Sequence, residues 1–141
     1  MPVTTTGVQY SGIWNLSSQA NAVALTTWPA AYNTVSLFSW GSNNAGQLGL
    51  GNTTYYSSPK QVGSSAWATI SAGVPGNFCL ATKGDGTLWA WGDNGQGQLG
   101  LGNTVNKSSP NQVGALTTWS KLSCGRPNVH AVKTDGTLWA W

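Results

Sequence analysis

The sequence predicts an all-β chain in which four short antiparallel strands form a repeated unit, and successive units stack as the blades of a propeller. Three observations lead to this prediction. A long segment with two tryptophans recurs with a period near 50 residues, a spacing typical of propeller blades and solenoid units. The strands of the unit are apolar on both faces, and no stretch inside the unit has the periodicity of a helix.

The repeat is centred on a glycine-rich segment. Residues 88–104 read LWAWGDNGQGQLGLGNT, and an earlier copy at 37–53 reads LFSWGSNNAGQLGLGNT at an offset of 51 residues. The match continues with SSPKQVG at 57–63, which returns as SSPNQVG at 108–114. A third copy begins with the sequence LWAW at 138–141. Small changes of offset fall in loops, where insertions are tolerated.

The repeat gives the expected domain organisation. Two units and the start of another follow a segment that belongs to no repeat. The expected divisions are an N-terminal arm at 1–35, propeller repeats at 36–141, a first unit at 36–86, a second unit at 87–136 and the start of a third at 137–141.

Turn and strand signals place a hairpin at the end of each unit. Asp85-Gly86 and Asp135-Gly136 are typical of tight hairpin turns. In the following run, 87–91, both tryptophans point to one face and Leu88 and Ala90 point to the other. Neither set is polar, so both faces are expected to be buried, as they are between stacked blades.

Three further strands complete the four-stranded unit. Residues 67–72 are expected to form a strand, with 78–81 as its antiparallel return. Gln61-Val62 is short and follows Pro59. Because proline cannot donate a hydrogen bond to a neighbouring strand, this segment fits an outer edge strand.

The N-terminal arm carries large apolar side chains and no Lys, Arg, His, Asp or Glu. Such side chains are costly to expose to water. We therefore predict that the arm docks on other protein chains, extended or only briefly helical. It lacks the basic start and apolar run of a signal peptide, and no span is long enough to cross a membrane. The predicted assembly contacts are Tyr10, Ile13, Trp14, Leu16, Val23, Leu25 and Trp28.

The motif Trp-Gly-x-Asn-x-x-Gly-Gln-Leu-Gly-x-Gly, followed by Ser-x-Pro-x-x-Val and by Asp-Gly-Thr-Leu-Trp-Ala-Trp, resembles the regulator of chromosome condensation repeat over residues 36–141. The resemblance implies a β-propeller, typically of about seven four-stranded blades. Such a ring needs on the order of 350 residues, so the chain is expected to be the N-terminal part of a longer protein. The family's Gly-x-x-His-Ser is replaced here at 77–79 and 127–129, with His130 out of register.

Composition indicates a folded chain with very few charges. Asp, Glu, Lys and Arg make up 6% of the residues, Glu is absent, and nine tryptophans supply much of the predicted core. Disordered chains show the opposite balance. The net charge of +3 comes from scattered basic residues, which argues against a nucleic-acid-binding surface.

The side chains that catalysis needs are scarce. Asp85, Asp93 and Asp135 are the only acids and His130 is the only histidine, so no catalytic residue, metal site or cofactor is predicted. The two turn aspartates are read as turn residues. The segment 95–100 matches the dinucleotide motif Gly-x-Gly-x-x-Gly, but a Ser-Ser-Pro strand follows in place of a helix. Its glycines are expected to serve turns and close packing.

Four other residues are singled out with their alternatives. Cys79 and Cys124 lie at different positions of their units and are expected to be free thiols; a disulfide between neighbouring blades is the alternative. Tyr55 and Tyr56, in the loop before Ser57, are the predicted surface-binding residues. The alternative is that both tyrosines pack against the neighbouring loop.

These observations lead to a functional prediction. The sequence Tyr-Ser-Gly-Ile-Trp-x-Leu at 10–16 resembles N-terminal segments of marine bacteriophage virion proteins. We therefore predict a non-enzymatic virion component, such as a tail fibre or capsid-associated protein. Its arm would bind other virion proteins, and its propeller loops would bind a host surface receptor or a glycan. No nucleic acid or membrane insertion is expected.

The resemblance to the regulator of chromosome condensation repeat implies a different function. Its eukaryotic members act as interaction scaffolds and as nucleotide-exchange factors for a small GTPase. This is the alternative prediction, with a cytoplasmic or extracellular location in place of the virion. An enzyme is disfavoured by the scarcity of ionisable side chains.

Overall fold

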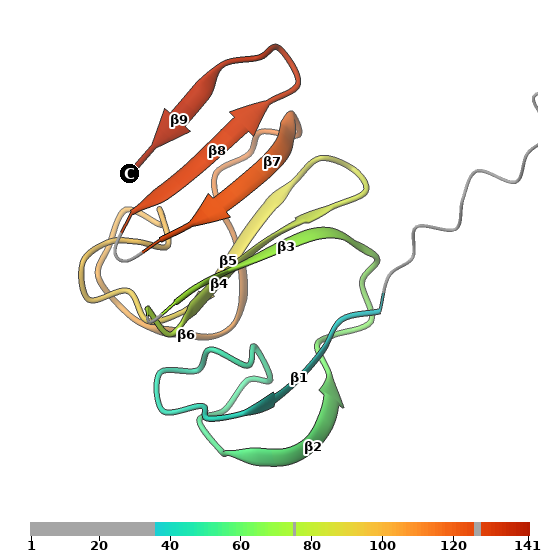
Figure 1. Cartoon of the computed structure of the whole chain (residues 1–141), viewed down its shortest axis with the longest axis vertical. Coiled ribbons are helices and arrows are strands. Elements are labelled where there is room, and N and C mark those ends of the chain that lie inside the picture. Colours follow the sequence, from blue (N-terminus) through green and yellow to red (C-terminus); the bar gives the residue numbers. More distant parts are fainter. Residues whose placement is uncertain (1–35, 75, 126–127) are drawn as a thin grey trace, which may run out of the picture. The chain divides into compact units, whose positions relative to one another are not determined.

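The computed structural model describes residues 36–74, 76–125 and 128–141, and these ranges contain strands but no helix (Figure 1). The predicted all-β class is confirmed. The arm at 1–35, with its seven predicted assembly contacts, lies outside the described residues. The strands are β1 (Phe38–Gly41), β2 (Tyr56–Gln61), β3 (Trp67–Gly73), β4 (Phe78–Lys83), β5 (Leu88–Gly92), β6 (Lys107–Gln112), β7 (Trp119–Cys124), β8 (Val129–Lys133) and β9 (Leu138–Ala140).

The strands form three antiparallel sheets. The central sheet has four strands in the order β3-β4-β5-β6. A two-stranded sheet, β1-β2, precedes it in the sequence, and a three-stranded sheet, β7-β8-β9, follows it. The four-stranded sheet matches the strand number predicted for one blade. This sheet runs from Trp67 to Gln112, whereas the sequence repeats begin at their Trp-Gly motifs. Each sequence repeat therefore contributes strands to two neighbouring sheets.

The inner strands β4 and β5 of the central sheet are buried on both faces, as the pattern of β5 predicts. Trp91 lies in an apolar cluster with Val62 and Trp67 on one face. Leu88 and Ala90 point to the opposite face and belong to the cluster that includes residues of β7 and β8. Burying a large apolar side chain contributes about 1.5–3 kcal/mol, so the central sheet is stabilised from both sides by its neighbours.

The outer strands β2 and β6 differ in one respect from the sequence-based prediction. The sequence predicts Pro59 before the strand, but it lies within β2, and Pro110 lies within β6. The pairing of each strand with its neighbour is irregular at this point, with a register shift between Ser39 and Gly41 and another between Ala90 and Gly92. A bulge on an edge strand can accommodate a residue without an N–H group, so proline does not have to precede the strand.

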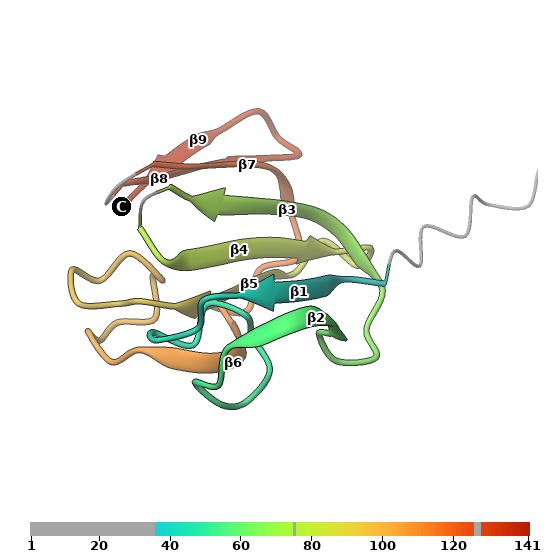
Figure 2. The same cartoon turned by 60° about the horizontal axis from the view of Figure 1, so that its bottom comes forward.

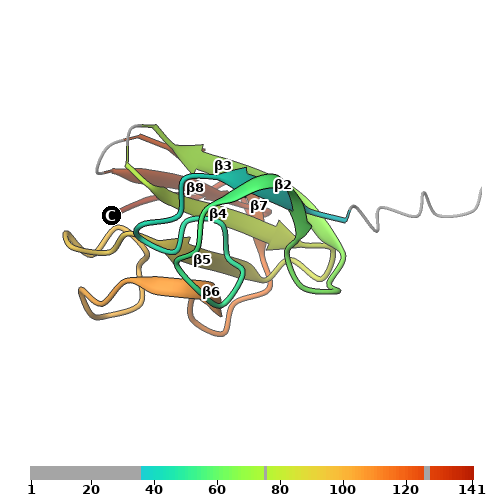
Figure 3. The ribbon, with the colours of Figure 1, turned by 90° about the horizontal axis from the view of Figure 1, so that it is seen from below.

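The connections separate into two groups at opposite ends of the described part. The long loops that follow β1 and β5 emerge at one end, and the hairpin turns β4–β5 and β8–β9 lie at the other (Figures 2 and 3). In the first of these turns, Gly86 has a φ of 78°, a conformation that favours glycine. The Asp-Gly pair is therefore a hairpin turn, as predicted.

Candidate interaction sites at the repeat junctions

The loop after β1 is organised by a buried asparagine. Asn43 is 0% exposed, and its side-chain oxygen accepts the main-chain N–H of Leu48 at 3.0 Å. Its amide donates to the carbonyl of Asn52 at 2.9 Å and to that of Thr54 at 3.0 Å. One side chain thus closes the loop from inside, because a buried amide requires partners for its donors and acceptor.

The loop after β5 repeats the same arrangement. Asn94 is also 0% exposed; it accepts from the N–H of Leu99 at 3.0 Å and donates to the carbonyls of Asn103 at 2.8 Å and Val105 at 3.2 Å. In addition, the side chain of Asn106 accepts the main-chain N–H of Asn94 at 2.8 Å. Sequence reasoning missed both asparagines as organising residues, although their recurrence at an offset of 51 residues was a signal that could have found them.

Each of these loops is joined to the next sheet by a tryptophan. The indole N–H of Trp91 donates to the main-chain carbonyl of Gln47 at 3.0 Å, and that of Trp141 donates to the carbonyl of Gln98 at 3.0 Å. The glycine two residues after each glutamine allows this approach. A Cβ atom on Gly49 would lie 2.8 Å from the indole nitrogen of Trp91, so any side chain there would displace the ring.

Trp40 occupies the corresponding position in the first repeat but has a different environment. Its side chain is 58% exposed, whereas that of Trp91 is 1% exposed. The two residues stand at matching positions of β1 and β5. Their burial differs because β5 is covered on that face by the preceding sheet, while no described residue covers Trp40 to the same extent.

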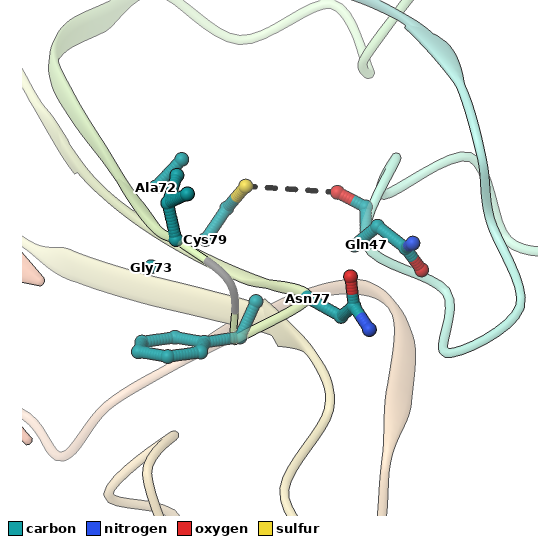
Figure 4. Close-up of a pocket in the computed structure, with 7 residues that line it drawn as sticks. Gln47, Ala72, Gly73, Asn77 and Cys79 are labelled. Atoms are coloured by element: carbon teal, nitrogen blue, oxygen red, sulfur yellow. Dashed lines mark hydrogen bonds between the residues drawn. The ribbon is translucent and has the colours of Figure 1, made fainter. Parts of the chain in front are cut away.

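A small cavity lies beside the junction of Gln47 with the central sheet. Its volume is about 230 Å³, and Figure 4 shows the thiol of Cys79 directed at the main-chain oxygen of Gln47, 3.6 Å away. Burial, and to a lesser extent the nearby Cys124, raises the pKa of Cys79 to about 12. The thiol is therefore protonated at neutral pH and acts as a weak donor rather than a nucleophile.

The two cysteines are free, as predicted. Cys79 packs against the cluster on the face of the central sheet that contains Trp91, whereas Cys124 packs against the cluster on the other face. The alternative of a disulfide between neighbouring blades is therefore not realised. Burial also raises the pKa of the Cys124 thiol.

Charged side chains gather at the hairpin turn after β4. The ammonium group of Lys83 lies 3.6 Å from the ring centroid of Trp89 and 5.4 Å from that of Trp67. The indole N–H of Trp89 donates to the hydroxyl of Thr87 at 2.8 Å, and that hydroxyl donates to the carboxylate of Asp85 at 2.6 Å. The hydrogen bonds from Thr87 lower the pKa of Asp85. The aspartate thus has the predicted role of a turn residue.

The turn after β8 has the same construction. Lys133 lies 3.6 Å from the ring centroid of Trp139, and the hydroxyl of Thr137 donates to the carboxylate of Asp135 at 2.7 Å. The hydrogen bonds from Thr137 lower the pKa of Asp135. Each of these two hairpin turns therefore carries one ammonium group, which lies over a tryptophan ring, and one carboxylate.

The two predicted surface-binding tyrosines have different environments. Tyr55 is 62% exposed in the loop before β2. Tyr56 is half-buried; its hydroxyl accepts a hydrogen bond from the side chain of Asn52 at 3.3 Å, and Lys60 lies 5.5 Å from its ring centroid. Tyr55 therefore remains available for a contact, whereas Tyr56 packs in part against its own loop.

The other chemical motifs carry no site in the described ranges. No group of three His, Cys, Asp or Glu residues there could hold a metal ion. The segment 95–100 lies in the loop after β5, with positive φ at Gly97 and Gly100, and no helix follows it. The described part of the chain contains no helix that is long and apolar enough to span a bilayer.

Comparisons with known proteins agree with this architecture. Human protein RCC2 is 36% identical over 124 residues, which cover 84% of this chain and 22% of RCC2. The X-linked retinitis pigmentosa GTPase regulator of the dog is 37% identical over 86 residues, 55% of this chain and 8% of that protein. The chain thus spans about a fifth or less of the length of these relatives.

Two solved structures share the fold. Human WBSCR16 superposes with a TM-score of 0.66 at 23% identity, over 77% of this chain and 29% of that one. Prp20p from Saccharomyces cerevisiae superposes with a TM-score of 0.61 at 21% identity, over 78% of this chain and 30% of that one. Its structure was described with its binding properties to Gsp1p and histones. The sequence model of the regulator of chromosome condensation (RCC1) repeat matches residues 36–80 and 85–132. The chain therefore belongs to the RCC1 repeat family, and its sheets are blades of an RCC1-type β-propeller.

Proposed function

We propose that the chain is part of a non-enzymatic propeller scaffold that binds a protein partner through the loops after β1 and β5. The observation that carries this proposal is the exposure of Tyr55 on a loop whose main chain is held by Asn43. A loop that is already ordered loses little conformational entropy on binding. Tyrosine is also among the residues that most often anchor protein interfaces.

The two repeats use one loop position differently. In the second repeat this position is Asn106, which accepts the N–H of Asn94. In the first repeat it is Tyr55, 51 residues earlier, and its side chain is 62% exposed. A position with an internal role in one repeat is thus open to solvent in the other, which supports a role for Tyr55 in contacts with other molecules.

The partners bound by Prp20p suggest which proteins to test first. We expect saturable binding of the chain to Gsp1p or to histones, measured by biolayer interferometry. Tyr55→Ala should weaken that binding about fivefold or more, as for an interface residue that contributes over about 1 kcal/mol. Leu116→Ala is the matched control, because Leu116 is 47% exposed and lies outside both loops. Unchanged affinity in Tyr55→Ala would contradict the proposed surface, and no binding to either protein would contradict the choice of partner.

A nucleotide-exchange role for a small GTPase is a narrower form of the same proposal. It is tested separately by following the release of fluorescent GDP from the GTPase in the presence of the chain. Acceleration that is lost in Tyr55→Ala would support exchange activity. Binding without faster GDP release would support the scaffold function and contradict the exchange-factor function.

A virion component is the second candidate, and it rests on the uncharged, apolar segment 1–35. In this proposal the segment binds other virion proteins and the propeller loops face a host receptor or glycan. The relatives named above come from animals and yeast and favour the first candidate. Deletion of residues 2–35 tests the virion role: incorporation into particles should be lost, and normal incorporation would contradict it.

A further inference from the structure

A second cavity lies at the end of the molecule that carries the Asp-Gly turns, between the central sheet and the β7-β8-β9 sheet. Its volume is about 440 Å³, within the range of small-molecule sites. Its polar lining combines hydroxyl groups with one cation and one anion. The polar groups come from Thr69, Thr82, Lys83, Asp85, Thr117, Ser120 and Thr134.

The charged groups of this cavity are held in place by their neighbours. Lys83 is stacked on Trp89 at 3.6 Å from the ring centroid. One carboxylate oxygen of Asp85 accepts the main-chain N–H of Thr87 at 3.0 Å and its hydroxyl at 2.6 Å, whereas the other is engaged in neither bond. A ligand would therefore meet an oriented ammonium group and a free carboxylate oxygen without having to order them first.

The turn that carries both charges is fixed to the neighbouring sheet. The main-chain N–H of Trp119 in β7 donates to the carbonyl of Gly86 in the turn at 3.1 Å. On the side of the β7-β8-β9 sheet, the N–H of Thr134 donates to the carbonyl of Thr118 at 2.8 Å. The cavity walls contributed by the two sheets are thus bonded to each other. The shape of the cavity is therefore fixed by a hydrogen bond between its two walls.

One wall residue has an unpaired polar atom. Among the described residues, the indole nitrogen of Trp119 is the buried side-chain nitrogen or oxygen without a hydrogen-bond partner, and Trp119 lines the cavity. Its counterpart Trp67 donates to the carbonyl of Val62 at 3.2 Å. Five residues separate Val113 from Trp119, where four separate Val62 from Trp67. The longer segment removes the internal acceptor, and a buried donor without one is costly.

We propose that this cavity binds a neutral carbohydrate. A sugar hydroxyl both donates and accepts, which suits a lining of hydroxyl groups, a carboxylate and an ammonium group. The single cation and single anion leave no net charge to favour an ionic ligand. The methyl groups of the lining threonines provide apolar contact for the C–H faces of a sugar ring. Trp119 lines the cavity, so the resonance of its buried indole N–H reports on a ligand that binds there.

The test is a titration of the 141-residue chain, labelled with ¹⁵N at its tryptophans, with neutral sugars. The probes are methyl glycosides of glucose, galactose, mannose and N-acetylglucosamine, chosen after a screen on a glycan array. At least one sugar should shift the indole N–H resonance of Trp119 saturably and leave that of Trp67 in place. Asp85→Asn should weaken the binding about tenfold or more, since hydrogen bonds to charged groups are among the stronger ones.

The chain provides a matched control for the aspartate. Asp135→Asn alters the equivalent turn, where Thr134 lines the cavity but Asp135 does not, and should leave the affinity unchanged. Asparagine can still accept from Thr87, so the turn is retained in Asp85→Asn; Lys83→Met provides a second variant. The proposal is overturned if no sugar binds saturably, if Trp119 does not respond, or if both aspartate variants lose affinity equally. It does not depend on the protein partner proposed above, so either can fail alone.

Discussion

The indole N–H of Trp91 and the main-chain carbonyl of Gln47 lie 3.0 Å apart, although 44 positions separate the two residues in the sequence. The same bond joins Trp141 to Gln98 at 3.0 Å across 43 positions. In each case a tryptophan in or next to a strand of one sheet bonds to the loop of the preceding repeat. Because a main-chain oxygen is the acceptor, the bond requires the loop to have the correct shape, and the buried asparagines provide that shape. The repeats are therefore connected by a hydrogen bond in addition to apolar packing.

Removing the tryptophan should separate two repeats that now pack together. Trp91→Ala is expected to lower the free energy of unfolding by about 3–5 kcal/mol, as for other large buried aromatic side chains. Trp40→Ala is the control and should lower it by less than about 1 kcal/mol, because surface substitutions have small effects and Trp40 is 58% exposed. Urea-induced unfolding measures both values. Equal losses would show that the bond to Gln47 and the cover around Trp91 contribute little.

The glycine beside each indole should be more sensitive than a glycine with the same main-chain conformation elsewhere in the loop. Gly100 and Gly102 have φ values of +67° and +70°, but a Cβ atom on Gly100 would lie 2.9 Å from the indole nitrogen of Trp141, and one on Gly102 would meet nothing within 4 Å. Both alanine variants have the strain of positive φ. Gly100→Ala should lose about 1–3 kcal/mol more than Gly102→Ala because it also overpacks the junction. Thermal unfolding of the pair separates the two effects, and similar melting temperatures would refute the close packing.

The buried asparagines should be essential for the shape of their loops. Asn94→Ala leaves the N–H of Leu99 and the carbonyl of Asn103 without their side-chain partner. We expect a loss of about 2–4 kcal/mol in unfolding free energy, since each buried group left unpaired costs about 1–3 kcal/mol. Asn111→Ala, which removes a single exposed hydrogen bond to Ser109, should change stability by less than about 0.5 kcal/mol. A loss in Asn94→Ala no larger than in the control would mean that water replaces the asparagine.

The Cys79 thiol should make stability depend on pH in the alkaline range. Its pKa is raised from 9.0 to about 12 in the folded protein, mainly by burial, so the folded state retains a proton that the unfolded state releases. The resulting stabilisation is complete below about pH 9 and is lost as the pH rises toward about pH 12. The difference in unfolding free energy between the wild type and Cys79→Ala should shrink over that interval. A constant difference from pH 8 to pH 11 would show that the thiol titrates alike in both states.

The sequence by itself determined the local features of the chain. Two-residue alternation in β5 predicted burial on both faces, and Asp-Gly pairs predicted hairpin turns. In the structure the aspartate of each turn accepts a hydrogen bond from the threonine two residues on. Pro59 predicted an edge strand, and only its place within that strand differed. These features follow from backbone geometry and from patterns a few residues long. The repeat itself identified the family, because two copies of one long motif leave little room for coincidence.

Only the tertiary structure decided which residues meet. Trp40 and Trp91 share one motif, yet one is exposed and the other buried, because burial depends on the sheet that lies beside each strand. The carbonyl of Gln47 gives no signal in the sequence, since every residue has one and only the folded loop directs this one at Trp91. The unpaired indole of Trp119 likewise depends on a single extra residue between Val113 and the strand that follows. Contacts between residues more than 40 positions apart depend on how whole sheets pack, and no local pattern encodes that arrangement.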